Sequence, residues 1–304
     1  MSLLVIGTVA FDEIETPRGK TGKILGGAGT YIGLAASHLT DDIKIVSVVG
    51  GDFPEEYQSL LKKHNIRTDG IKVIPDGKTF FWAGRYHENM NMRDTLVTDL
   101  NVLADFDPVV PEHARSSKYL MLGNLTPSIQ RRVIEQMEPR PELIVMDTMN
   151  FWMDTALNDL VDVISMVDVL TVNDEEARQL SGEYSLNKAA KKILNMGPRY
   201  LIVKKGEHGA LLFHEDKIFH APAMPLEDVF DPTGAGDTFA GGFIGYIAKT
   251  GDTSFENMKR AIIYGSAMAS FTVEKFGTER LAELNQENIK KRLQEFVSLV
   301  AFEI

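Results

Sequence analysis

Short apolar runs alternate with segments of helical character along most of this 304-residue chain. Residues 3–7 (LLVIG) and 143–147 (LIVMD) are typical of strands that are buried on both faces of a parallel sheet. Residues 32–39 are small and apolar, as expected for a helix that packs against such a sheet. Because the alternation continues over residues 3–271, we predict one main α/β domain with a mostly parallel central sheet flanked by helices.

Composition narrows the classes of function. A net charge of −11 argues against nucleic acid or an anionic membrane as the main partner, since both require a basic surface. The chain has no cysteine, which excludes disulfides, thiolate zinc sites and cysteine nucleophiles. We find neither a signal-like leader nor an apolar run of membrane-spanning length, so we expect a cytoplasmic enzyme.

The pattern changes at residue 71. Residues 71–74 and 78–86 are strand-like and flank a turn over residues 75–77 (PDG), which predicts an antiparallel hairpin. A ribbon of this kind does not belong in a doubly wound sheet. We therefore expect it to form a separate small lid.

We expect this lid to comprise about residues 8–24 and 71–100, inserted within a single domain of residues 1–304. Its aromatic side chains are expected to pack inside the lid or between two lids, which predicts a homodimer through the lid. Stacking on a ligand is the alternative. These aromatic residues are Phe80, Phe81, Trp82 and Tyr86.

A glycine-rich turn precedes the most small-residue-rich helical segment of the chain. The turn, residues 231–239 (DPTGAGDTF), contains Gly234, Ala235 and Gly236, which carry almost no side chain. Such a turn can aim several backbone N–H groups into one concavity, and the following helix adds the positive end of its dipole. We therefore predict an anion site of the kind that holds phosphate.

Two acids bracket this turn, Asp231 and Asp237. A carboxylate beside a phosphate site is suited to take a proton from a hydroxyl as that hydroxyl attacks phosphorus. Helix capping would explain one acid on its own. Because there are two, we favour the catalytic interpretation for Asp237.

The run Asp231-x-Thr233-Gly234-Ala235-Gly236-Asp237 resembles the C-terminal signature of the PfkB, or ribokinase-like, family of carbohydrate and nucleoside kinases. The resemblance extends from Asp12 to Gly277 and implies a ribokinase-like fold with a small antiparallel β lid. It implies transfer of phosphate from ATP to a primary hydroxyl. Asp237 would be the general base, and the turn would bind the transferred group.

The resemblance also assigns an acceptor site. Asp12 would hold hydroxyl groups of the acceptor, with Gly26 and Gly27 allowing its close approach; a tight turn that needs glycine for geometry is the alternative. The family usually has Asn where this chain has Tyr31. Tyr cannot offer the paired donor and acceptor of an amide, but it can stack on a ring or close the pocket.

Asn173-x-x-Glu176 matches a family motif for Mg²⁺ held beside phosphates, largely through water. A helix cap, with Asn173 at the N-cap and Glu176 at N3, fits the same pattern equally well. The resemblance further implies a monovalent cation, such as K⁺, near Asp231.

On the nucleotide side, the resemblance implies an ATP site near two glycine-containing segments. Lys204 replaces the Thr or Ser of many relatives, and a cation there suits a triphosphate. Asp147 and Asn150 follow a strand end and are weaker pocket candidates, because the Asp-x-Asn-x-Arg pattern of the family is absent. The predicted ATP-binding residues are Lys204, Gly206, Gly209, Thr233, Ser266 and Gly277.

The sequence therefore predicts an ATP-dependent kinase that acts on a primary hydroxyl of a small sugar-like acceptor. A nucleoside kinase on the same fold is the first alternative. A non-catalytic sugar or nucleotide sensor is the second, although a pure binder would need neither Asp237 nor the Asn173-x-x-Glu176 motif. An NAD(P)-linked enzyme lacks its glycine fingerprint, since the third glycine after Gly27-Ala28-Gly29 falls one place late, at Gly33.

Overall fold

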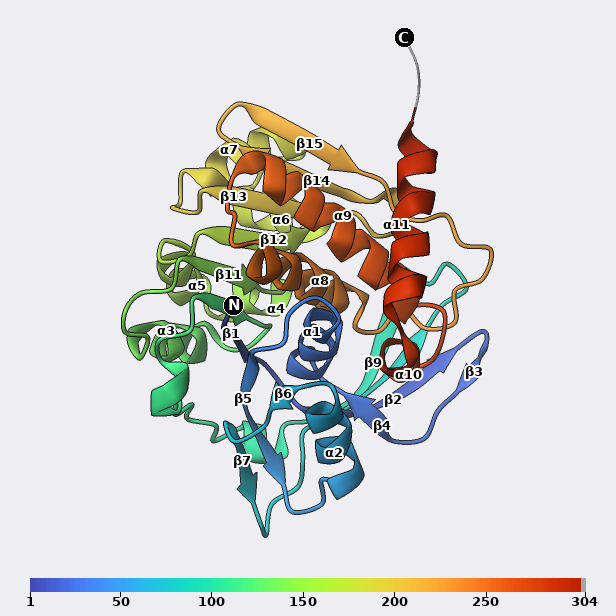
Figure 1. The fold of residues 1–304 in the computed structure, drawn as a ribbon. Coiled ribbons are helices and arrows are strands. Elements are labelled where there is room, and N and C mark those ends of the chain that lie inside the picture. The colour runs from blue at the N-terminus through green and yellow to red at the C-terminus, as the bar shows by residue number, and fades with distance from the viewer. Residues whose placement is uncertain (302–304) are drawn as a thin grey trace.

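The computed structural model describes residues 1–301 and contains two sheets (Figure 1). The larger sheet has ten strands in the order β15-β14-β13-β12-β11-β10-β1-β5-β6, and β7 also pairs with β5. The strand pairs from β13 to β6 are all parallel, and so is the pair of β5 with β7. Only β14 and β15 pair in the antiparallel sense, which confirms the predicted mostly parallel sheet. Its strands are β1 (Leu3–Ile6), β5 (Ile43–Gly50), β6 (Ile66–Arg67), β7 (Ile71–Ile74), β10 (Tyr119–Leu122), β11 (Leu143–Asp147), β12 (Val169–Asn173), β13 (Tyr200–Lys204), β14 (Ala210–His214) and β15 (Lys217–Ala221).

Helices cover both faces of this sheet (Figure 1). Successive strand residues point to opposite faces, so Leu3 and Val5 belong to one hydrophobic core, and Leu4 and Ile6 to the other. The first core is shared with α1 (Ala28–Ser37), α2 (Glu55–Lys63), α8 (Ala235–Thr250), α9 (Phe255–Thr272), α10 (Glu279–Glu283) and α11 (Gln286–Val300). The second core is shared with α3 (Pro127–Glu135), α4 (Asn150–Thr155), α5 (Leu157–Ile164), α6 (Asp174–Ser181) and α7 (Leu186–Leu194).

The second sheet, called the small sheet below, has five strands in the order β3-β2-β8-β9, with β4 also paired to β2. Three of its strand pairs are antiparallel, β2 with β3, β2 with β4 and β8 with β9, whereas β2 and β8 run parallel. Its strands are β2 (Ala10–Thr16), β3 (Gly19–Lys20), β4 (Ile24–Gly26), β8 (Phe81–Tyr86) and β9 (Arg93–Asp99).

The prediction of a hairpin over residues 71–86 is wrong. β7 pairs in parallel with β5 in the large sheet, and β8 pairs with β9 instead. Hydrogen bonds hold residues 77–79 against the chain that follows β5. Gly51 N–H donates to Gly77 O at 3.1 Å, and Thr79 Oγ1 donates to Asp52 at 2.7 Å. The turn over residues 75–77 forms, but the strands on either side of it do not pair with each other.

None of the helices in residues 1–301 combines the length and the apolar character that crossing a membrane would require.

Candidate active site

The glycine-rich turn over residues 231–237 leads into α8. Gly234 is the N-cap of this helix, with φ of 73° in the left-handed region that favours glycine. A Cβ added at Gly234 would lie 2.6 Å from the ring of Tyr31. The turn therefore requires glycine here both for its backbone angle and for the ring packed against it.

The turn presents free backbone donors. Within residues 1–301, the N–H groups of Gly234, Gly236 and Asp237 have no hydrogen-bond acceptor. The Ala235 N–H donates instead to Pro232 O at 3.2 Å, so Ala235 does not share the donor role that the sequence predicted for it. Free N–H groups at the positive end of a helix dipole bind anions such as phosphate.

Asp237 lies in the first turn of α8, directly beside these donors. Burial, and then the negative charge of Asp147, raise the pKa of Asp237 to about 7. The cations Lys204 and Arg93 act in the opposite direction. A carboxyl group with this pKa is partly ionised near neutral pH, which suits a group that accepts a proton from a hydroxyl.

A buried ion pair borders the turn. Lys204 ends β13, and its Nζ donates to Asp147 Oδ1 at 2.8 Å. Thr171 Oγ1 donates to the same oxygen at 2.7 Å. The three residues come from the neighbouring parallel strands β11, β12 and β13, so their proximity follows from the order of the sheet.

The predicted acceptor residues lie together at the junction of β2, β4 and α1. A Cβ added at Gly26 would lie 1.9 Å from Asp12 Oδ2, so only glycine leaves room for this carboxylate. Gly27 has φ of 93° and approaches Thr8 O so closely that an added Cβ would lie 2.5 Å from it. Both glycines therefore serve a close approach of backbone to other groups.

Asp12 faces the glycine-rich turn and the buried Tyr31. Burial, followed by the charge of Asp231, raises the pKa of Asp12 to about 7. The Tyr31 ring is 1% exposed, and its hydroxyl has no partner within residues 1–301. Burial, and then the charges of Asp12 and Asp231, raise the pKa of this hydroxyl well above its usual value. Tyr31 thus brings an unpaired neutral hydroxyl into a region rich in carboxyl groups.

A cavity of about 510 Å³ lies on the other side of the turn. Four of the six residues predicted for ATP line it: Lys204, Gly206, Gly209 and Ser266. Gly236 of the glycine-rich turn also borders it, so the cavity and the free N–H groups are continuous. Much of the remaining wall is apolar and includes Met224, Pro225, Leu226, Val229 and Val273.

Comparison with known proteins identifies the family. The model described as pfkB family carbohydrate kinase matches residues 2–284. The chain belongs to the pfkB family. It is therefore an ATP-dependent kinase, as the sequence predicted.

The kinase is 27% identical to a cytidine kinase of Thermococcus kodakarensis, over 80% of this chain and 87% of that protein. It is 26% identical to a nucleoside kinase of Methanothermobacter thermautotrophicus, over 95% of this chain and 94% of that protein. A ribokinase-type structure from E. coli, in complex with ATP and Mg²⁺, matches with a TM-score of 0.80 at 20% identity, covering 97% and 99% of the two chains. This last match shows the fold alone and confirms the ribokinase-like prediction.

Two residues predicted to bind ATP, Thr233 and Gly277, do not line the cavity of the kinase. Their N–H groups each donate a hydrogen bond of 2.8 Å to Asp231, which is fully buried. These bonds tie the glycine-rich turn to the segment after α9. A monovalent cation beside Asp231 remains a prediction.

Asn173 and Glu176 form the helix cap that competed with metal binding in the sequence. Asn173 Oδ1 accepts from the Glu176 N–H, and Glu176 Oε2 accepts from the Asn173 N–H, both at 2.7 Å. Burial raises the pKa of Glu176 to about 7, against the effect of Lys204. Within residues 1–301, no group of three or more His, Cys, Asp or Glu side chains is arranged to hold a metal directly. The second oxygen of Glu176 remains available, which fits a cation bound mainly through water.

The small sheet contributes residues that the sequence analysis did not assign to the site. Tyr86 accepts a hydrogen bond from Thr233 Oγ1 at 3.1 Å and so joins β8 to the glycine-rich turn. Arg93 of β9 lies near enough to Asp237 and Glu176 to lower the pKa of both. Nothing in the sequence distinguishes Arg93 from other exposed arginines, because its position depends on the pairing of β9 with β8.

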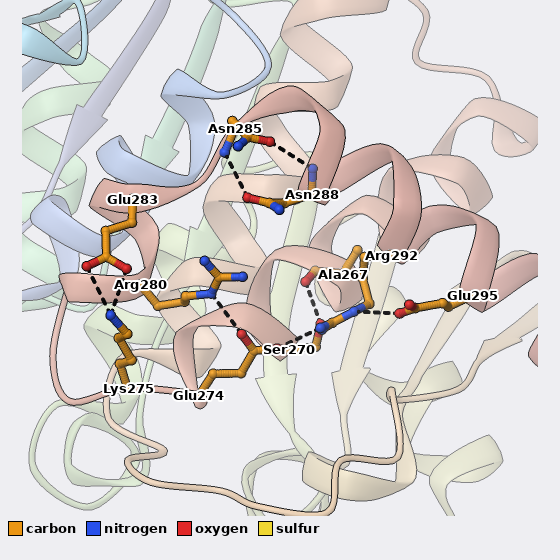
Figure 2. A network of polar contacts seen from close by, with 10 residues as sticks. All are labelled: Ala267, Ser270, Glu274, Lys275, Arg280, Glu283, Asn285, Asn288, Arg292 and Glu295. Atoms are coloured by element: carbon orange, nitrogen blue, oxygen red, sulfur yellow. Dashed lines mark hydrogen bonds and ion pairs between the residues drawn. The ribbon is translucent and has the colours of Figure 1, made fainter.

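A network of polar contacts joins the C-terminal helix α11 to the end of α9 and to the segment after it (Figure 2). Arg292 of α11 donates to Glu274 Oε1 at 2.6 Å and also contacts Ser270 Oγ. Arg280 donates to Glu274 Oε2 at 2.8 Å. Because Ser270 lines the cavity, this network holds the end of α9 in position beside it. Asn150 plays no such part, since it is exposed and accepts a hydrogen bond from the Phe151 N–H.

Proposed function

We propose that this kinase transfers the γ-phosphoryl group of ATP to the 5′-hydroxyl of a nucleoside. The proposal is supported by two curated relatives, a cytidine kinase and a nucleoside kinase, that each match most of their own length. A site for a nucleoside needs a group for the ribose hydroxyls and a flat surface for the base. Asp12 supplies the first.

The observation that carries the choice of a nucleoside is the position of Trp82. Asp12 and Trp82 are partners in the parallel pair of β2 and β8, so both side chains leave the same face of the small sheet. The indole ring lies over Gly84, where an added Cβ would be 2.2 Å from it. Glycine thus allows the ring to lie along the sheet as a platform beside the proposed ribose site. Tyr31 in place of an amide agrees with a ligand that is not a free sugar.

The proposed reaction is an in-line displacement. As the acceptor oxygen forms its bond to the γ-phosphorus, its proton passes to Asp237. The bond between the γ-phosphorus and the β–γ bridging oxygen breaks, and its electron pair leaves with ADP. The free N–H groups of Gly234 and Gly236 stabilise the charge on the transferred group.

Mg²⁺ fits this site, because the nearby donors are oxygens and one oxygen of Glu176 is available. When bound, it would neutralise phosphate charge, with Asn173 and Glu176 holding it largely through water. The complex of the E. coli structure with ATP and Mg²⁺ supports this choice of ion. K⁺ near Asp231 is proposed on the family resemblance alone.

The substitution Trp82→Ala tests the nucleoside assignment. Stacking of a base on an aromatic ring contributes about 1–3 kcal/mol, so kcat/KM for cytidine should fall about tenfold to a hundredfold. Trp82→Phe should retain most of the activity. Residual turnover of free ribose, which has no base, should be equal in wild type and Trp82→Ala. An equal loss for cytidine and ribose would contradict the platform role.

We further infer that the small sheet is a lid and that two copies of the kinase associate through it. All seven residues of β9 are exposed, and β9 ends the small sheet with an open edge. Leu96 and Leu100 are 48% and 49% exposed on or beside this strand. An open edge with apolar side chains is a site for strand pairing with another chain.

Light scattering tests this association. We expect a mass of twice the 33.8 kDa of one chain. Leu96→Asp should yield the single-chain mass, because a carboxylate at the interface would be desolvated. A single-chain mass for wild type at the concentrations of the assay would contradict the dimer.

A further inference from the structure

Lys204 occupies the point where the cavity meets the anion-binding turn. It lines the cavity, and a Cβ added at Gly236 would lie 3.4 Å from its Nζ. The side chain is only 17% exposed, so its ammonium group is held in place and shielded from bulk water. A phosphate bound by the free N–H of Gly236 would therefore lie within reach of this ammonium group.

The pairing of Lys204 leaves donors available. Within residues 1–301, Asp147 is the only acceptor of a hydrogen bond from its Nζ, at 2.8 Å. An ammonium group has three N–H donors, so two remain for a ligand. Asp147 is itself fixed by Thr171 Oγ1 at 2.7 Å, and its backbone O accepts from Gln130 Nε2 at 3.0 Å. The carboxylate that holds Lys204 is thus rigid.

The charges around Lys204 explain why a cation is needed there. Three carboxyl groups act on it, those of Asp147, Glu176 and Asp237. Without Lys204, a triphosphate entering the cavity would meet these three carboxyl groups directly. Like charges within a few ångströms in a poorly solvated site repel strongly. An ammonium group between the acids and the phosphate removes this repulsion and adds charge-assisted hydrogen bonds.

We propose that Lys204 is a catalytic residue that donates hydrogen bonds to the phosphoryl group being transferred, and that Asp147 is the positioning residue that holds it there. The proposal rests on the proposed function, because it takes ATP as the donor. The cavity wall and the catalytic turn then bind the same phosphate from two sides.

Nucleotide binding by calorimetry is the first test, with Mg²⁺ present and no acceptor. Lys204→Met should bind ATP about tenfold to a hundredfold more weakly than wild type, whereas AMP, which lacks the distal phosphates, should bind equally. Lys205→Met is the matched control. It removes the same charge from the next residue, whose side chain does not line the cavity. Equal ATP affinity of the two variants would overturn the proposal.

A charge-balanced variant separates direct contact from general electrostatics. Lys204→Met combined with Asp147→Asn removes the ion pair as a whole. If Lys204 acted only by neutralising Asp147, ATP affinity would return to the wild-type value in this double variant. We expect it to stay low, because the donors are still missing. Lys204→Arg, which keeps the charge and the donors, should retain more ATP affinity than Lys204→Met.

The pH profile supplies a second readout that a purely structural role would not change. Lys204 lowers the pKa of Asp237, so its removal should shift the acid limb of kcat/KM to higher pH. Lys205→Met should leave the limb unchanged. An unshifted limb in Lys204→Met would show that Lys204 does not act on the reacting groups. The charged or titratable groups that face Asp237 are Asp12, Tyr31, Arg93, Asp147 and Lys204.

The two possible failures are distinguishable. Absence of turnover by wild type with every nucleoside and sugar would contradict the proposed function, even if Lys204 were needed to bind ATP. Turnover by wild type, together with full ATP affinity and an unchanged pH profile in Lys204→Met, would contradict only the role of Lys204. Melting curves of each variant establish that binding is measured on folded protein.

Discussion

Asp237→Asn should lower kcat about a hundredfold to ten-thousandfold, the range that general base catalysis contributes. The substitution keeps the size of the side chain but removes its ability to accept the hydroxyl proton. ATP affinity should change little, because the free N–H groups of the turn are retained. The measurement is ADP formation with Mg-ATP and a nucleoside. Wild-type turnover in Asp237→Asn would show that the base is another group.

The control and the pH dependence sharpen this result. Asp159 occupies the same third position of helix α5 but is exposed, so Asp159→Asn should leave turnover unchanged. Because the pKa of Asp237 is raised to about 7, kcat/KM of the wild type should rise with pH and level off above this value. Asp237→Asn should lose this rise.

The free energy of unfolding should fall as pH rises, whereas kcat/KM should rise. A buried carboxyl group whose pKa is raised binds its proton more tightly in the folded state, so stability is lost as pH rises through about 7. Asn has no charge to bury. The Tm of Asp237→Asn at pH 8 should therefore be no lower than that of the wild type, which separates loss of activity from loss of folding.

Gly234→Ala should disable the turn. The new residue would have to adopt φ of 73°, and its Cβ would lie 2.6 Å from the Tyr31 ring. A strained backbone angle of this kind costs about 1–3 kcal/mol, and the ring adds a steric penalty. Displacement of a single N–H donor from an anion hole costs about a hundredfold to a thousandfold in kcat. We expect both a lower Tm and a loss of kcat of at least this size.

Gly182→Ala is the matched control for the turn. Gly182 has nearly the same φ, 69°, but a Cβ there would meet nothing within 4 Å. It should show only the penalty of the backbone angle and should keep wild-type kcat. If Gly234→Ala behaved like Gly182→Ala in both stability and kcat, neither the contact with Tyr31 nor the geometry of the turn would matter as described.

The features predicted well from sequence are local or follow from the order of the sheet. The apolar run of β11 and the small-residue helix after Gly234 could each be read from a few neighbouring residues. Asp147 and Lys204 end the parallel strands β11 and β13, which flank β12, and the residues of a ligand site gather at such strand ends in α/β proteins. The strand ends that carry these two residues could therefore be predicted from the sequence, and their roles in a site stay predictions.

The features that were missed depend on distant pairing. Residues 71–74 carry the same alternation whether they pair with β8 or with β5, and the choice was made by contacts of β5 with residues 77–79. Arg93 reaches the site only because β9 lies against β8. The cap formed by Asn173 with Glu176 shows a third limit, since one spacing suits both a helix cap and a hydrated metal.

The most direct test of the proposed reaction is to incubate the kinase with Mg-ATP and each of cytidine, adenosine, inosine and ribose, and to identify the products by mass spectrometry and ³¹P NMR. We expect ADP and a nucleoside 5′-monophosphate in equal amounts, with at least one nucleoside turned over faster than ribose. Saturable ATP binding without any phosphorylated product, or phosphorylation of ribose in preference to every nucleoside, would contradict the proposed function.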